Sequence, residues 1–323
     1  MFGLAVQQRA ARAQQHRQVS RTASVGAPVG GWNTRDNQAD MPETDAVTLI
    51  NWFPTATDIR VRRGYQAWST GYGAAVQTLM FYSGDTQRKL FAASGTSIYD
   101  ATASGAVGAA VQTGLANAQW IHVNFTTTGG TRYLVAVNGA DSPRIWDSAT
   151  WTAVTGVSTP AITGITTTQI AYVASHKSRL WLLRKNTIEA YYLPVGGFGA
   201  ASLFDLRPVF RRGGTLVACE TWTLDGGYGM DDHLAFISSE GEIAVYMGTD
   251  PSNAATWALI GLYYFSKPVG TRPLFKFGGD LLVSTLDGVF QLSQSLQSSR
   301  VNTKTAITDK IQQALTDAQS ANL

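Results

Sequence analysis

The 323-residue chain has 25 Lys and Arg residues and 22 Asp and Glu residues, so its formal net charge is +3 and only 15% of it is charged. Soluble domains average about 25% charged residues, so this chain relies on uncharged polar surface. Its hydrophobic content of 44% suffices for a large core and excludes global disorder. The single cysteine excludes an internal disulfide framework and a cysteine-cluster zinc site. No apolar run approaches the ~20 residues that span a bilayer, so we expect a soluble protein without a membrane-spanning segment.

Residues 1–29 form a basic block in which no acidic residue precedes Asp36. Such blocks occur as solvated arms, as segments that order on a protein or nucleic-acid partner, and as organelle-targeting peptides. No hydrophobic stretch follows the basic residues, so the block is not a secretory signal. We expect a flexible arm, and leave open whether it binds protein or DNA, because its arginines lack interleaved aromatic residues. The four arginines are Arg9, Arg12, Arg17 and Arg21.

Residues 30–74 are divided by proline and glycine into pieces too short for a long helix. The alternation in Ile59–Arg62 predicts a strand with one buried face. Aromatic residues such as Trp32 and Trp52 need burial, which a segment this short cannot provide. We therefore expect it to dock onto something larger.

From residue 75 to about 300 the chain repeats one pattern: an apolar run, a polar turn, and a second run that usually contains an aromatic residue. Five units recur at spacings of 44 to 54 residues, a period typical of β-propellers. The sequence therefore predicts an all-β, propeller-like array of about five four-stranded antiparallel blades. Equivalent leucines in the five units are Leu90, Leu134, Leu180, Leu234 and Leu281. Outer strands are expected at Ala110–Thr113, Trp151–Thr155 and Trp257–Leu262.

The fifth unit has no obvious outer strand after Leu292. An open sheet edge has to be covered, and the strand Ile59–Arg63 has no partner of its own. We therefore expect this N-terminal strand to complete the last blade and latch the ring. The alternative is that the blades belong to a larger ring.

Residues 301–323 are expected to form a C-terminal helix or linker. Ile307, Ile311 and Leu315 recur at i, i+4 and i+8, as on the apolar face of an amphipathic helix over Thr305–Ala321. Such a helix would dock on a neighbouring surface.

The sequence contains no recognisable catalytic or metal-binding motif. It has no His-Glu-x-x-His, no phosphate-binding Walker loop and no Gly-x-Ser-x-Gly elbow, and the four histidines fall in different units. Cys219 lies in an apolar strand and is expected to be inert core. The pair Asp231-Asp232 is either a solvated acidic turn or a calcium pair. We therefore predict no catalytic, metal-binding or cofactor-binding residue, although a triad assembled across blades is invisible in a sequence.

The charge balance also argues against a protein that wraps DNA, because each phosphate contact needs a Lys or Arg. Arg207, Arg211 and Arg212 form the one local cluster outside the N-terminal segments. This cluster is either a solvated loop or a contact to DNA or to a partner's acidic residues. A surface with little net charge suits a channel wall past which DNA moves without strong electrostatic adhesion.

The segment Gly30–Tyr65 resembles part of a family of virion proteins from short-tailed, podovirus-like bacteriophages and related prophages. These are tail nozzle proteins, also described as packaged-DNA stabilisation proteins. The resemblance covers about 35 residues, and the repeat that follows agrees with it. It rests on Gly-Gly-Trp-Asn-Thr-Arg-Asp at 30–36, Met41-Pro42, Asp45-Ala46, Leu49, Asn-Trp-Phe-Pro at 51–54 and Arg-Val-Arg-Arg-Gly-Tyr at 60–65.

This resemblance implies a structural protein of the virion tail, assembled in the host cytoplasm. Members form a ring, expected to be a hexamer, below the portal and the head–tail adaptor. The ring lines or closes the DNA exit channel and retains packaged DNA until ejection. Tail fibres or tailspikes are further implied partners, and passing double-stranded DNA is touched non-specifically. The shared motif is structural, so no residue role is carried over.

Two alternatives remain at this point. One is a carbohydrate- or protein-binding propeller, as in fibre attachment or receptor binding, with aromatic residues converging on one face. The other is a glycoside hydrolase, which needs two carboxylates roughly 5–9.5 Å apart. For the structural role, the candidate interface residues are Arg9, Arg12, Arg17, Arg21, Trp32, Arg35, Trp52, Arg211 and Arg212.

Overall fold

The computed structural model describes residues 26–225, 230–295 and 303–321. The arginines of the expected N-terminal arm lie outside these residues. The chain divides into two compact units, Met1–Asn33 with Gln38–Arg62, and Thr34–Asn37 with Arg63–Leu323. We call them the small unit and the large unit.

The small unit contains two pairs of short strands. In the first pair, β1 (Gly31–Trp32) lies parallel to β2 (Asp45–Ala46). In the second, β3 (Trp52–Pro54) lies antiparallel to β4 (Ile59–Val61). The strand expected in this region therefore has a partner close by in sequence, where loop closure costs little entropy. The prediction that it completes the last propeller blade is wrong.

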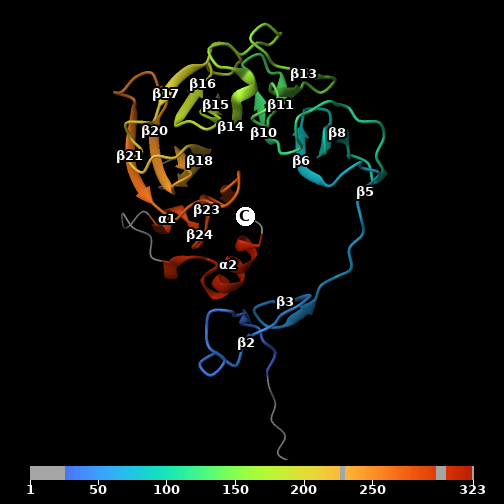
Figure 1. Ribbon diagram of the computed structural model, residues 1–323, viewed down its shortest axis with the longest axis vertical. Helices are drawn as coiled ribbons and strands as arrows, with labels where there is room; N and C mark the ends of the chain where they lie inside the picture. Colours follow the sequence, from blue (N-terminus) through green and yellow to red (C-terminus); the bar gives the residue numbers. More distant parts are fainter. Residues whose placement is uncertain (1–25, 226–229, 296–302, 322–323) are drawn as a thin grey trace, which may run out of the picture. The chain divides into compact units, whose positions relative to one another are not determined.

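The large unit is a β-propeller of five antiparallel sheets, which confirms the predicted fold. Figure 1 shows the sheets following one another around a common centre, with the first strand of each sheet nearest to it. The first strands of successive sheets contact each other, as blades of a propeller do. The first two sheets comprise β6 (Val76–Ser83), β7 (Arg88–Ser94) and β8 (Ser97–Asp100), then β10 (Ile121–Thr126), β11 (Arg132–Val137), β12 (Arg144–Trp146) and β13 (Trp151–Ala153). The third comprises β14 (Ile170–His176), β15 (Arg179–Arg184), β16 (Glu189–Tyr192) and β17 (Ser202–Asp205). The fourth and fifth comprise β18 (Leu216–Asp225), β19 (Met230–Ser238), β20 (Glu242–Gly248) and β21 (Trp257–Tyr264), then β22 (Leu274–Phe277), β23 (Asp280–Thr285) and β24 (Gly288–Gln291).

The outer strands differ from sheet to sheet. The expected outer strands of the second and fourth sheets are present as β13 and β21, and the third sheet adds β17, which the sequence pattern missed. In the first sheet the expected strand Ala110–Thr113 is reduced to one bridge, between Ile98 and Gln112. A short parallel pair, β5 (Ser69–Thr70) with β9 (Gly105–Ala106), accompanies this sheet.

The C-terminal segment covers the outer edge of the fifth sheet. It contains α1 (Leu292–Ser295), the short 3-10 turns η2 (Thr303–Thr305) and η3 (Asp309–Ile311), and α2 (Gln312–Ser320). The Ile307 N–H donates to the Val289 carbonyl at 2.9 Å, and the Val289 N–H donates to Thr308 Oγ1 at 3.0 Å. These bonds satisfy backbone groups of β24 that a fourth strand would otherwise pair.

The same bonds explain why the helix is shorter than expected. The pattern predicts a helix over Thr305–Ala321, but α2 begins only at Gln312. Ile307 gives its backbone N–H to β24 instead of to a preceding helical turn, and the Thr308 carbonyl accepts the Ile311 N–H at 2.9 Å in the 3-10 turn η3, so the α-helix starts only after these residues. None of the helices in the described ranges is long and apolar enough to cross a membrane.

The main core runs through the second to fifth sheets and is densest between the third and fourth. There Trp181 stacks on Trp257 at a centroid distance of 5.5 Å and meets Phe236 edge-on at 5.4 Å. A smaller core joins the first sheet to the second and is centred on the fully buried Trp120. The apolar runs of the repeat therefore form the contacts between blades.

Candidate functional site

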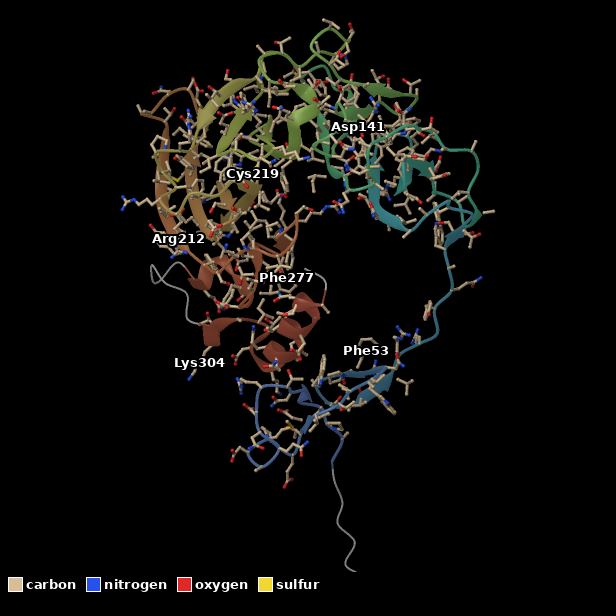
Figure 2. The ribbon with its side chains drawn as sticks, in the orientation of Figure 1. Phe53, Asp141, Arg212, Cys219, Phe277 and Lys304 are labelled. Carbon is tan, nitrogen blue, oxygen red and sulfur yellow. The ribbon has the colours of Figure 1, made fainter. Side chains whose placement is uncertain are left out.

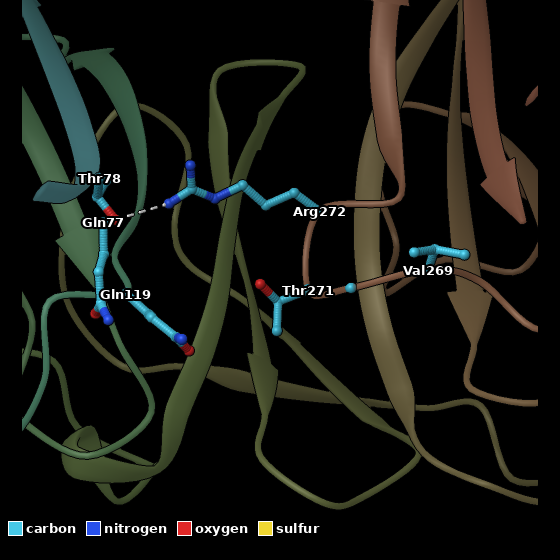
Figure 3. A pocket seen from close by; sticks show the side chains of 7 residues that line it. Gln77, Thr78, Gln119, Val269, Thr271 and Arg272 are labelled. Carbon is cyan, nitrogen blue, oxygen red and sulfur yellow. Dashed lines mark hydrogen bonds between the residues drawn. The ribbon is translucent and has the colours of Figure 1, made fainter. Parts of the chain in front are cut away.

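A polar cavity of about 480 Å³ lies at the centre of the propeller (Figure 3). Thr271 and Arg272 project into it from the loop that precedes β22. Gln77 and Thr78, at the start of β6, and Gln119, just before β10, line the other side. The cavity therefore brings together the first, second and fifth sheets, which are far apart in sequence.

Thr78 joins these sheets through its hydroxyl group. Its Oγ1 donates to the Ala118 carbonyl at 2.7 Å and accepts the Trp120 N–H at 3.0 Å. Arg272 Nη2 donates to the same Oγ1 at 3.2 Å and also to the Trp120 carbonyl. A threonine hydroxyl offers one donor and two acceptor sites, and all three are used here.

The charge at the centre is positive and has no neighbouring carboxylate among the residues described. Burial lowers the pKa of the Arg272 guanidinium from its usual value, and the groups that accept its hydrogen bonds, Thr78 and Trp120, are neutral. Burial, and secondarily the charge of Arg272, lowers the pKa of His122 to about 4. His122 is therefore neutral at pH 7. Burial also raises the pKa of Tyr172 on β14.

A second cavity, of about 310 Å³, shares Gln119 and Thr271 with the first. Its lining is rich in amides and includes one cation, Lys185, whose Nζ donates to the Gly139 carbonyl at 3.2 Å. No Asp or Glu is among the described residues that line either cavity. The amides that line this second cavity are Asn117, Gln119, Asn138 and Asn186.

The first and last blades each leave one apolar face uncovered. On β6, Thr78, Met80 and Tyr82 are buried toward the second sheet, whereas Leu79 and Phe81 on the other face are 55% and 47% exposed. We call the Leu79 and Phe81 side the first free face.

The fifth sheet shows the same asymmetry. On β22, Leu274 is buried and Lys276 reaches Glu220 of the fourth sheet, so these two side chains face the neighbouring blade. Phe275 and Phe277 alternate with them and are 42% and 61% exposed, forming the last free face. By contrast, β14 in the middle of the propeller has buried residues on both faces.

The small unit also presents apolar surface. Ile50, Phe53 and Val61 are exposed, and Trp52 with Ile59 lines an apolar cavity of about 560 Å³ within the unit. Contiguous exposed apolar surface in a soluble protein marks a binding or assembly surface.

The predicted interface residues of the small unit fall on this surface. Trp32 is half exposed, with its Nε1 donating to the Val47 carbonyl at 2.9 Å, and Trp52 is 46% exposed. Their positions allow the anchoring role that the sequence suggested. Arg9, Arg12, Arg17 and Arg21 lie outside the described residues.

The predicted arginines of the large unit have partners within the chain. Arg35 pairs with Asp36 and Asp309. The backbone N–H groups of Arg211 and Arg212 donate to the carboxylate of the fully buried Glu242, at 3.0 and 2.8 Å. The Arg207–Arg212 cluster is thus held by the fourth sheet through its backbone, which its sequence did not indicate.

Other sequence-based interpretations are resolved by burial. Cys219 is fully buried within the core of the large unit (Figure 2), and burial raises the pKa of its thiol. Asp231 and Asp232 lie in strand β19 and not in an acidic turn. Asp232 accepts the Thr223 hydroxyl at 2.8 Å and pairs with Lys177 at 3.6 Å. Within the ranges that the structure describes, no group of three or more His, Cys, Asp or Glu side chains could hold a metal ion.

The polar centre was missed at the sequence level because no local signal marks it. Thr78, Gln119 and Arg272 belong to three different units of the repeat, and each stands in an ordinary context. Only the folding of the repeat units around a common centre brings them together.

No protein-family model matches the chain, and no curated protein sequence matches it. Solved structures are similar to it in fold. The chain shares 13% identity and a TM-score of 0.42 with BBS1N in complex with ARL6DN, covering 67% of itself and 64% of that chain. For the periplasmic gluconolactonase PpgL of Pseudomonas aeruginosa the values are 14%, 0.40, 65% and 65%. For the extracellular domain of the hybrid two component system BT3049 from B. thetaiotaomicron they are 11%, 0.43, 74% and 30%. The chain thus spans about two thirds of the first two chains and under a third of the last, and nothing that these proteins bind or do is carried over to it.

Proposed function

We propose that this chain is a structural virion protein of a short-tailed phage, of the tail nozzle or packaged-DNA stabilisation type. The observation that carries the proposal is the pair of free faces on the first and last blades. A propeller that worked alone would gain by covering these four large side chains or replacing them with polar ones. Their presence supports a protein that completes its burial by assembling.

In this proposal identical copies form a ring, hexameric as in the family it resembles, beneath the portal and adaptor. The free faces and the apolar surface of the small unit supply the contacts between copies or with the adaptor and the tail fibres. A permanent interface of this kind buries more than about 2,000 Å². The ring retains packaged DNA by surrounding its exit channel, and a net charge of only +3 keeps electrostatic adhesion to DNA weak.

The proposal assigns no chemistry to the chain. Cys219 is buried, and His122 is neutral at pH 7 because burial holds its pKa at about 4. Neither side chain is therefore given a reactive role in the proposed function.

Mass photometry of the purified full chain, alone and with the adaptor protein, tests the proposal. We expect a ring of defined order, and we expect the double variants Leu79→Ser/Phe81→Ser and Phe275→Ser/Phe277→Ser to remain monomeric at micromolar concentration. Val157→Ser is the matched control, since Val157 is 96% exposed and lies on neither free face. Circular dichroism should show the same β content in all variants. A chain that stays monomeric with and without the adaptor would contradict the proposal.

A further inference from the structure

The propeller centre contains a cation that the fold itself does not neutralise. Arg272 is exposed as a residue, but its guanidinium donates to two groups of the buried Thr78 and Trp120, the Thr78 hydroxyl and the Trp120 carbonyl. Contact with these buried groups removes part of the solvent around the guanidinium and lowers its pKa, and a cation that loses solvent is normally paired with an opposite charge. No carboxylate offers such a pairing among the described residues lining the cavity.

Three further polar side chains at the cavity, those of Gln77, Gln119 and Thr271, belong to exposed residues. No described hydrogen bond involves the side-chain amides of Gln77 or Gln119, and both amides line the cavity beside Arg272 (Figure 3). Thr271, on the same loop as Arg272, adds a hydroxyl. Amide and hydroxyl groups pair well with the hydroxyl groups of a sugar, since each can both donate and accept.

A second cation flanks the same space. The cavity of about 310 Å³ shares Gln119 and Thr271 with the cavity of about 480 Å³, and Lys185 is among the residues that line it. Volumes of this order are typical of small-ligand sites, which are of roughly 300–1,000 Å³. The two cavities therefore adjoin, and each has one cation among the residues that line it, Arg272 in the first and Lys185 in the second.

We infer that the propeller centre binds a small polyhydroxylated anion, a sugar that carries a carboxylate or a phosphate. Arg272 binds the anionic group, as guanidinium groups do for planar carboxylates and for phosphates. Gln77, Gln119 and Thr271 bind the hydroxyl groups. The site can be tested apart from the proposed assembly, since Gln119, Thr271 and Arg272 do not lie on a free face, although Gln77 adjoins the first one on β6.

Isothermal titration of the full chain with glucuronate, glucose 6-phosphate, glucose and inorganic phosphate tests this inference. We expect at least one acidic sugar to bind, and to bind roughly tenfold or more tightly than glucose, because a charge-assisted hydrogen bond is worth that much. The first two probes distinguish a carboxylate from a phosphate as the recognised group. The assignment would be overturned if glucose bound with the same affinity as the acidic sugars, if inorganic phosphate were the only probe to bind, or if neither acidic sugar bound.

Two variants separate recognition from folding. Arg272→Gln should weaken binding of the acidic sugar about tenfold or more, whereas Arg272→Lys should retain part of it. Gln119→Ala removes an amide for which the described residues provide no partner, so it should weaken binding while leaving the melting temperature unchanged. Binding that is undiminished in both Arg272→Gln and Gln119→Ala would contradict the site. A failed titration leaves the ring measured by mass photometry unaffected, so the two proposals fail separately.

Discussion

Large apolar side chains occur both at the junction between the third and fourth sheets and on the two free faces. They are buried at the junction and exposed on the free faces. At the junction, Trp181 and Trp257 are almost completely buried against each other. On the free faces, Phe81 and Phe277 stand about half exposed. The difference lies in the neighbour and not in the residue type. Apolar side chains on both faces of an innermost strand therefore indicate that a neighbour is expected on both sides.

The exposed side chains on the free faces cost the single chain free energy. Burying apolar surface contributes about 25 cal/mol per Å², so each large side chain left in water forgoes a gain of the order of 1 kcal/mol or more. Polar side chains at the same positions would keep the single chain equally stable and more soluble. Apolar side chains at these positions are favourable only if another surface covers them.

The largest expected effect comes from removing a side chain at the junction. Trp181→Ala should lower the free energy of unfolding by about 3–5 kcal/mol, because it deletes a fully buried aromatic ring and leaves a cavity. Phe277→Ala is the comparator on the last free face and should change the monomer by no more than about 1 kcal/mol. Urea denaturation of both variants measures the two values. Similar losses would mean that the free face is buried within the single chain.

A smaller effect is expected where the C-terminal segment covers the fifth sheet. Gly288 has φ +131°, and a Cβ there would lie 2.8 Å from Thr308 Oγ1 and 3.0 Å from the Ala306 Cβ. Gly288→Ala should therefore cost about 1–3 kcal/mol from backbone strain and crowding, and should loosen the segment that covers β24.

Gly278→Ala is the matched control for that loosening. Gly278 also has positive φ, +60°, but a Cβ there meets open space. It should cost only the backbone strain, about 1 kcal/mol. Hydrogen exchange at Val289 and Ile307 should rise in Gly288→Ala alone, and unchanged protection there would show that the covering bonds do not depend on this contact.

Much of this architecture was predictable because it depends on local patterns. The recurrence of Leu90, Leu134, Leu180, Leu234 and Leu281 identified the five blades, and alternation identified the strands. All five leucines lie in the second strand of their sheet. The repeat period and the alternation are properties of the sequence itself, so both can be recognised without knowledge of the tertiary structure.

The partner of a strand edge was not predictable in the same way. Ile59–Arg63 and Thr305–Ala321 both had the composition to cover β24, and pairing depends on chain closure that the sequence pattern does not encode. In the structure the C-terminal segment takes this place, and its Thr308 hydroxyl accepts the Val289 N–H. Arg272 and Thr78 are likewise 194 residues apart, and their meeting at the centre follows from the arrangement of the blades around it.

The smallest expected effect is the loss of stability in acid that the buried His176 causes. His176 is 2% exposed, and its Nδ1 lies 3.1 Å from Thr221 Oγ1, whose own proton goes to the Ser175 carbonyl. Burial chiefly lowers the pKa of His176 to about 4. The charged or titratable groups that act on it are Lys177, Asp232, His233 and Lys276.

Between pH 6.5 and 4 the unfolded chain therefore binds a proton at His176 that the folded chain does not, so stability falls as the pH falls through this window. The loss should reach about 1–2 kcal/mol at pH 5. His176→Asn keeps an N–H donor for Thr221 but does not titrate, so it should flatten the dependence of the melting temperature on pH while the Ser variants of the free faces keep the full slope. If His176→Asn retains the wild-type slope, the acid-sensitive group lies elsewhere, and His122, whose pKa is also lowered to about 4, becomes the next position to exchange.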